Sequence, residues 1–120
     1  MRPLIVSLLI FLAGCSGLKE TSAELDLTKL RTLLVAIQPL ISKGFGETEI
    51  NDIDNTFRAL ALNETKQMNF RIVYEGTETD LRVLVRKEAA DAVEIRFLCN
   101  AKLSEQIKHT IRTTPLDISN

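Results

Sequence analysis

Three segments in the second half of the chain alternate apolar and polar residues, and this period of two constrains the fold more than any other feature. The segments run over residues 67–74, 81–86 and 93–99. Successive side chains of a strand point to opposite faces of a sheet, so each segment predicts a strand with one apolar face. Short connections join them, with Gly76 in the first turn, which favours antiparallel pairing. The sequence therefore predicts a three-stranded antiparallel meander.

Helical spacing flanks this predicted meander. Apolar steps of three and four residues predict a first helix that ends near Gln38, because Pro39 cannot continue it. Thr21 and Glu24 have the spacing of a capping box, which favours a helix start there. Two further helices are predicted over 47–62 and 101–112, with Asn100 as the N-cap of the last. The predicted order is α-α-β-β-β-α, a small two-layer α+β domain.

Length and composition exclude several classes of protein. The chain has 120 residues, of which 45% are apolar and 26% charged, the usage of one globular domain. Its net charge of −1 gives no long-range attraction to nucleic acid. With five Phe, one Tyr and no Trp, it is poor in the aromatic side chains that base-stacking and sugar-stacking surfaces use. We expect no nucleic-acid partner.

An apolar run over residues 4–12 follows the basic residue Arg2. As a helix, nine residues span about 13 Å, whereas the hydrocarbon core of a bilayer is about 30 Å thick. A basic start, a short apolar run and small residues after it are typical of a secretory signal peptide. The pattern therefore predicts export rather than a membrane-spanning helix.

The run ends in Leu12-Ala13-Gly14-Cys15, which resembles the lipobox of bacterial lipoproteins. The resemblance covers the export signal alone. It implies that residues 1–14 are removed and that Cys15 carries a diacylglyceryl thioether, usually with a further acyl chain on its new amino group. Two or three acyl chains hold a protein stably on a membrane. Ser16 in the next position favours the outer membrane, so the resemblance implies an anchor there with the domain facing the periplasm.

The domain organisation follows from these patterns. We expect the signal peptide over 1–14, the lipidated cysteine with a tether over 15–24, one α+β domain over 25–114 and a loose tail over 115–120. Residues 17–23 are short, small and polar, which is the basis for the predicted tether.

Candidate catalytic and metal-binding groups are few. Cys99 has the apolar parity of its predicted strand, which indicates a buried thiol rather than a nucleophile. His109 is the sole histidine and cannot by itself form a usual metal site. The acidic stretch 52–56 resembles the phosphatase motif of the haloacid dehalogenase family, but it lies on a predicted helix instead of after a strand. We therefore predict no catalytic residues, no metal and no cofactor.

Four arginines share the second face of the predicted sheet, mixed with apolar residues: Arg71, Arg82, Arg86 and Arg96. One interpretation is a solvated face with cross-strand ion pairs, for example with Glu94. The other is a docking face for an acidic partner, because arginine interleaved with apolar groups is typical of interfaces.

These observations favour a protein-protein interaction module, anchored to the membrane through Cys15, that recognises another envelope protein or itself as a homodimer. An assembly or secretion accessory and an inhibitor or immunity protein fit equally well. The alternatives are a carrier of a small apolar ligand, held between sheet and helices, and a periplasmic hydrolase.

Overall fold

The computed structural model describes residues 18–114, and the predicted signal peptide, Cys15 and the tail over 115–120 lie outside the described residues. The element order is β2 (Leu18–Asp26), α2 (Leu27–Ile37), the short 3-10 helix η2 (Gln38–Leu40), α3 (Glu47–Ala59), β3 (Thr65–Tyr74), β4 (Thr77–Ala89), β5 (Ala92–Asn100) and α4 (Ala101–Thr113). The α+β class is confirmed, with one strand more than predicted.

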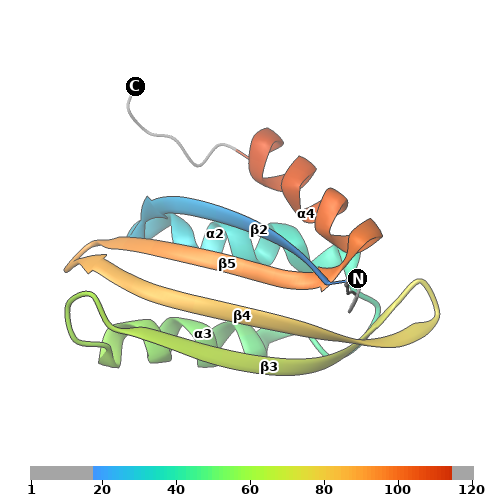
Figure 1. Ribbon diagram of the computed structural model, residues 1–120, viewed down its shortest axis with the longest axis horizontal. Coiled ribbons are helices and arrows are strands. Elements are labelled where there is room, and N and C mark those ends of the chain that lie inside the picture. The colour runs from blue at the N-terminus through green and yellow to red at the C-terminus, as the bar shows by residue number, and fades with distance from the viewer. Residues whose placement is uncertain (1–17, 115–120) are drawn as a thin grey trace, which may run out of the picture.

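The strands form one antiparallel sheet in the order β2-β5-β4-β3 (Figure 1). The predicted meander is present as β3, β4 and β5, joined by tight turns. The fourth strand, β2, pairs with β5 along its whole length, from Leu18 opposite Asn100 to Asp26 opposite Ala92. The sheet thus joins the first described element to the last strand.

Strand β2 corrects three predictions. The segment predicted as a tether is a strand from Leu18 onward, the fold begins there rather than at residue 25, and Thr21 and Glu24 do not cap a helix. Thr21 and Leu25 are buried while their neighbours are exposed, so the period of two holds here as well. Pairing with β5 stabilises this strand, because it supplies backbone hydrogen bonds that a tether would make with water.

The other elements follow their sequence signals closely. Helix α2 buries its predicted apolar stripe and gives way at Gln38 to the 3-10 turn that holds Pro39. The Asn100 side chain accepts a hydrogen bond of 2.8 Å from the Leu103 N–H at the start of α4, as predicted. Helix α3 ends at Ala59, three residues before the predicted end, and the Gly46 N–H at its start donates to Glu49 Oε1.

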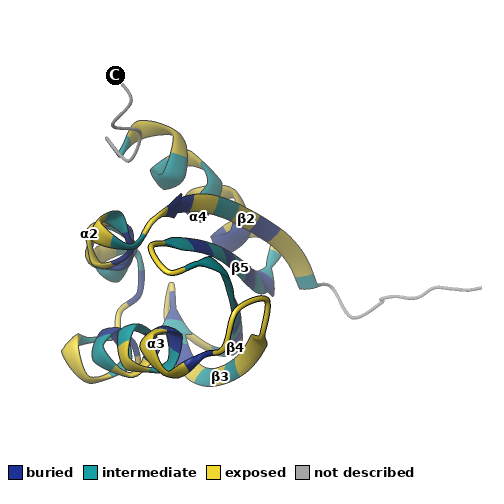
Figure 2. Cartoon of the chain, turned by 90° about the vertical axis from the view of Figure 1, so that its left-hand side faces the viewer, coloured by how far each residue is buried: buried dark blue, intermediate teal, exposed yellow. Residues whose placement is uncertain are grey.

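All three α-helices of the described part lie on one side of the sheet. Figure 2 shows α2 and α3 against this side, and the buried Thr21 joins α4 to β2 through a 2.7 Å contact with the Ser104 hydroxyl. We call this side the inner face. Its largest fully buried side chains include Phe97, Ile95, Leu81 and Ile72, which meet Phe57 and the helix leucines. This core lies between the sheet and the helices.

The loop between η2 and α3 covers part of the free edge of β3. The Ser42 N–H donates to the Val73 carbonyl, and the Val73 N–H donates to the Lys43 carbonyl, each at 2.9 Å. Gly44 has a φ of +94°, and a Cβ there would lie 2.4 Å from the Arg71 carbonyl oxygen. Glycine is therefore required where the loop crosses the strand.

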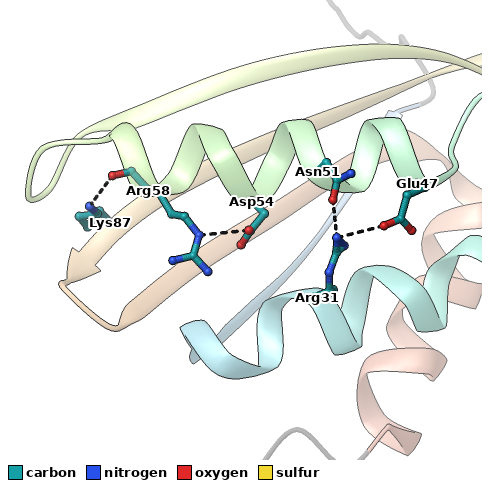
Figure 3. Close-up of polar contacts among 6 residues, drawn as sticks. All are labelled: Arg31, Glu47, Asn51, Asp54, Arg58 and Lys87. Atoms are coloured by element: carbon teal, nitrogen blue, oxygen red, sulfur yellow. Dashed lines mark hydrogen bonds and ion pairs between the residues drawn. The ribbon is translucent and has the colours of Figure 1, made fainter.

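Polar contacts on the outside of the helix layer account for several charged residues. Arg31 on α2 bonds to Glu47 and Asn51 on α3, which ties the two helices together (Figure 3). Arg58 pairs with Asp54 one helical turn away at 3.1 Å. These are exposed contacts, each of which contributes a few tenths of a kcal/mol, on the order of 0.3–0.5 for a helical pair.

Candidate functional site

The side of the sheet opposite the helices carries the predicted arginines, and no described helix covers it. We call this side the open face. The strand register sets three cross-strand rows on it, each with one residue from every strand. The first row is Glu20, Leu98, Arg82 and Asn69; the second is Ser22, Arg96, Leu84 and Gln67; the third is Glu24, Glu94, Arg86 and Thr65.

The third row is a charge cluster around Arg86. The Arg86 Nε donates to Glu94 Oε1 and its Nη2 donates to Glu88 Oε2, both at 2.8 Å. The hydrogen bond to Glu94 raises the pKa of Arg86. Burial, with the nearby Glu24 carboxylate next, raises the pKa of Glu88 even though Arg86 opposes the shift. Three carboxylates thus surround one guanidinium, and this end of the open face is acidic.

The first row is different, because its arginine has no partner in the described part of the chain. Within residues 18–114, the Arg82 side chain takes part in no hydrogen bond or ion pair. It lies opposite the half-buried Leu98 on β5 and Asn69 on β3. Arg82 therefore offers an unpaired cation beside apolar surface.

The remaining two arginines form ion pairs with carboxylates at different distances. Arg71 pairs with Asp80 at 2.8 Å and with Glu78 at 3.5 Å, and the hydrogen bond to Asp80 raises the pKa of Arg71. Arg96 lies 3.9 Å from Glu20, at the outer limit of an ion pair. Arg71 and Arg86 thus form cross-strand ion pairs of the kind that the first interpretation expects, whereas Arg82 forms none with residues 18–114.

Sequence reasoning placed all four arginines on the second face of the sheet. It missed the acids that β2 contributes, Glu20 and Glu24, because that segment was predicted as a tether. The alternation of polar residues with Thr21, Ala23 and Leu25 was the signal that could have found them.

The candidate reactive groups lie apart from this face. Cys99 is fully buried on the inner face of β5, as predicted, and burial raises the pKa of its thiol to about 12. A thiol with such a pKa is a poor nucleophile at neutral pH. His109 is exposed on α4, and the 52–56 stretch lies on α3 with Ile53 in the core. Among residues 18–114, no group of three or more His, Cys, Asp or Glu could hold a metal ion.

A surface hollow of about 620 Å³ lies where α2 ends and α3 begins. Val35, Pro39, Ile41 and Phe45 give it an apolar lining, with Lys43 and Glu49 also in its wall. It lies at the helix ends, not between sheet and helices, where the alternative of a ligand carrier would place its pocket. The side chains between sheet and helices are those of the buried core.

Comparison with known proteins adds no relative: no protein-family model, no curated protein and no solved structure matches the chain. In the described part of the chain, every helix is too short or too polar to cross a bilayer.

Proposed function

We propose that this protein is a lipid-anchored bacterial envelope protein whose open face binds another envelope protein. The anchor rests on the sequence, in which an apolar run leads into Leu12-Ala13-Gly14-Cys15. The binding function rests on the open face. The proposal takes the outer membrane as the site of the anchor, on the strength of Ser16.

The observation that carries the binding function is the unpaired Arg82 beside half-buried leucines. Leu98 lies directly opposite Arg82, and Leu84 is two residues along the same strand. Arginine in an apolar setting that excludes water is a common energetic centre of protein interfaces. A carboxylate of a partner would form a charge-assisted hydrogen bond with it, and the leucines would bury apolar area around that bond.

The acidic third row makes the charge of the open face asymmetric, which favours one orientation of a bound partner. Its carboxylates would repel the same partner carboxylates that Arg82 attracts, so a partner with acidic and basic groups in the matching order would bind in one orientation. Electrostatic complementarity of this kind sets the register and the association rate more than the affinity.

The test is crosslinking in intact cells, followed by solubilisation and mass spectrometry of what a C-terminally tagged copy captures. We expect one recurrent envelope protein with the unchanged chain and a loss of that protein, by tenfold or more, with Arg82→Glu. Arg112→Glu is the matched control, because Arg112 is an exposed arginine on α4, away from the open face. Equal capture by Arg82→Glu and Arg112→Glu would refute the role of the open face.

Capture of the chain by itself would identify the partner as a second copy. Sedimentation of a soluble form beginning at Ser16 then measures the dimer directly, and Arg82→Glu should return it to the monomer.

The anchor has its own test. The intact mass of the purified protein should correspond to a chain that begins at Cys15 and carries a diacylglyceryl group. An unmodified cysteine would disprove the anchor.

A further inference from the structure

The strands and helices reverse direction at every connection, so one end of the domain gathers distant parts of the chain. At this end Leu18 opens β2 opposite Asn100, and the nearby Lys102 on α4 pairs with Glu75 in the β3–β4 turn at 2.9 Å. Lys43 bridges to Val73 near the end of β3. Figure 1 shows the start of β2 beside the start of α4 at this end. We call it the proximal end.

Strand β2 begins very close to the predicted lipid. Leu18 is the third residue after Cys15. Three residues reach at most about 11 Å even when fully extended. A domain anchored through Cys15 therefore has Leu18, at its proximal end, within about 11 Å of the lipidated residue, whatever the conformation of the residues between.

From this constraint we infer that the proximal end faces the membrane and that the open face stands along the membrane normal, where it receives a protein held at the same membrane. The inference rests on the proposed lipid anchor. The described residues carry 14 Lys and Arg against 15 Asp and Glu, by count along the sequence. A net charge of 14 − 15 = −1 gives the domain no electrostatic reason to lie flat on an anionic surface.

The register then assigns heights to the rows of the open face. The Arg82–Leu98 row lies two residues along the sheet from the Leu18–Asn100 pair, which is about 7 Å. Added to the reach of the anchor, this places the Arg82 row at most about 20 Å from Cys15 along the strand direction. Because β4 is two strands away from β2, the straight distance from Cys15 to Arg82 is at most about 23 Å. Arg86 lies four residues farther along β4, about 13 Å more distant.

The distances of these rows from the membrane limit which proteins can bind the open face. Its acidic and apolar contact segment must lie within about 20 Å of the membrane surface, as in a segment next to a membrane anchor or a membrane-spanning element. A partner that is free in the periplasm could reach the acidic row as easily as Arg82, whereas a partner at the membrane meets the Arg82 row first.

The orientation is measured with variants of the full, lipidated protein that each carry one added cysteine. Thr77→Cys, at the start of β4, marks the proximal end. Ala90→Cys, in the turn just after β4, marks the far end, thirteen residues or about 40 Å away. Both positions are exposed. Cys99 is buried with a pKa of about 12, so it does not take the label, and Cys15 is blocked by lipid.

Each variant carries an environment-sensitive fluorophore and is placed in vesicles of phosphatidylethanolamine and phosphatidylglycerol that contain a nitroxide-headgroup lipid. We expect the label at Thr77→Cys to be quenched at least threefold more than the label at Ala90→Cys. Ser42→Cys and Ala61→Cys, exposed positions at the proximal and far ends, form a second pair that guards against misfolding of one variant.

A stiff proline-rich spacer of about 20 residues after Gly17 extends about 60 Å. It should remove the quenching at Thr77→Cys, since the proximal end is then no longer held at the membrane.

Equal quenching at the two ends, or stronger quenching at Ala90→Cys, would overturn the orientation while the lipid anchor stands. A protein that lacks the diacylglyceryl mass and does not float with the vesicles would instead overturn the proposed function. The two failures are thus separate measurements on the same samples.

Discussion

The two faces of the sheet use neighbouring residues of the same strands for opposite purposes. On β5, Phe97 is fully buried under the helices, and the next residue, Leu98, is half-buried on the open face. On β2, Thr21 is buried and Ser22 exposed. Side chains one residue apart point in opposite directions. Stability and surface chemistry can therefore be varied separately within each strand.

The largest difference in stability is expected between alanine variants of Phe97 and Leu98. Phe97→Ala should lower the free energy of unfolding by about 3–5 kcal/mol, because it opens a cavity in the core. Leu98→Ala should cost about 1 kcal/mol, because a half-buried leucine loses less apolar contact. Urea denaturation followed by circular dichroism measures both. Similar losses for the two variants would contradict the division between the faces.

A smaller difference in stability is expected between valine variants of Thr21 and Ser22. Thr21→Val keeps the shape of the side chain but leaves the buried Ser104 hydroxyl without its 2.7 Å partner, which should cost about 1–3 kcal/mol. Ser22→Val, on the exposed side, should change stability by less than about 0.5 kcal/mol. Adding Ser104→Ala to Thr21→Val should recover part of the loss, since the unpaired hydroxyl is then removed. A loss that stayed the same in the double variant would argue against this hydrogen bond.

The acidic row of the open face predicts a pH effect at Glu88. The pKa of Glu88 is raised in the folded protein, so the fold binds this proton more tightly than the unfolded chain does. The contribution of Glu88 to stability is thus fully present below its ordinary pKa of 4.5 and is lost as the pH rises through the raised value.

Glu88→Gln should therefore make the protein more stable at neutral pH, and the difference from the unchanged chain should disappear below pH 4.5. Urea midpoints measured across this range test the prediction. Glu105→Gln, at an exposed position on α4, is the control. A stabilisation that did not depend on pH would mean that Glu88 acts through packing rather than charge.

The smallest effect on stability is expected at Arg82. Because Arg82 has no ion pair among the described residues, Arg82→Glu should change the free energy of unfolding by less than about 0.5 kcal/mol. The same variant is the one expected to lose partner capture. Thermal unfolding of the purified variant shows whether a loss of partner capture comes from a changed open face or from a destabilised fold. A large drop in stability would mean that Arg82→Glu cannot serve as a test of binding.

The elements whose signals are local were predictable from the sequence. Helix α3 and strands β3, β4 and β5 have clear periods, and Asn100 caps α4 as its position suggested. Strand β2 was missed because two of its three inward positions are the buried Thr21 and the half-buried Ala23, which carry little hydrophobic signal. Its stability comes from β5, more than sixty residues away along the chain, and a local pattern cannot report such a partner.

The same difference applies to the candidate site. The parity of the strands placed Arg71, Arg82, Arg86 and Arg96 on one face, and the Arg86–Glu94 pair was open to prediction because both strands were predicted. That Arg82 forms no ion pair with the other described residues could not be predicted. It depends on the register of four strands and on the acids that β2 brings to the sheet.

The pairing of β2 with β5 also has a consequence for how the chain folds. Strands β3, β4 and β5 meet neighbours in sequence through tight turns, but Leu18 must find Asn100, a separation of 82 residues along the chain. Contacts of such long range close late and slow folding, because the loop between them loses its freedom before the contact forms. Of the described strands, the one synthesised first is thus expected to join the sheet last, and the four-stranded sheet stays incomplete until residue 100 has left the ribosome.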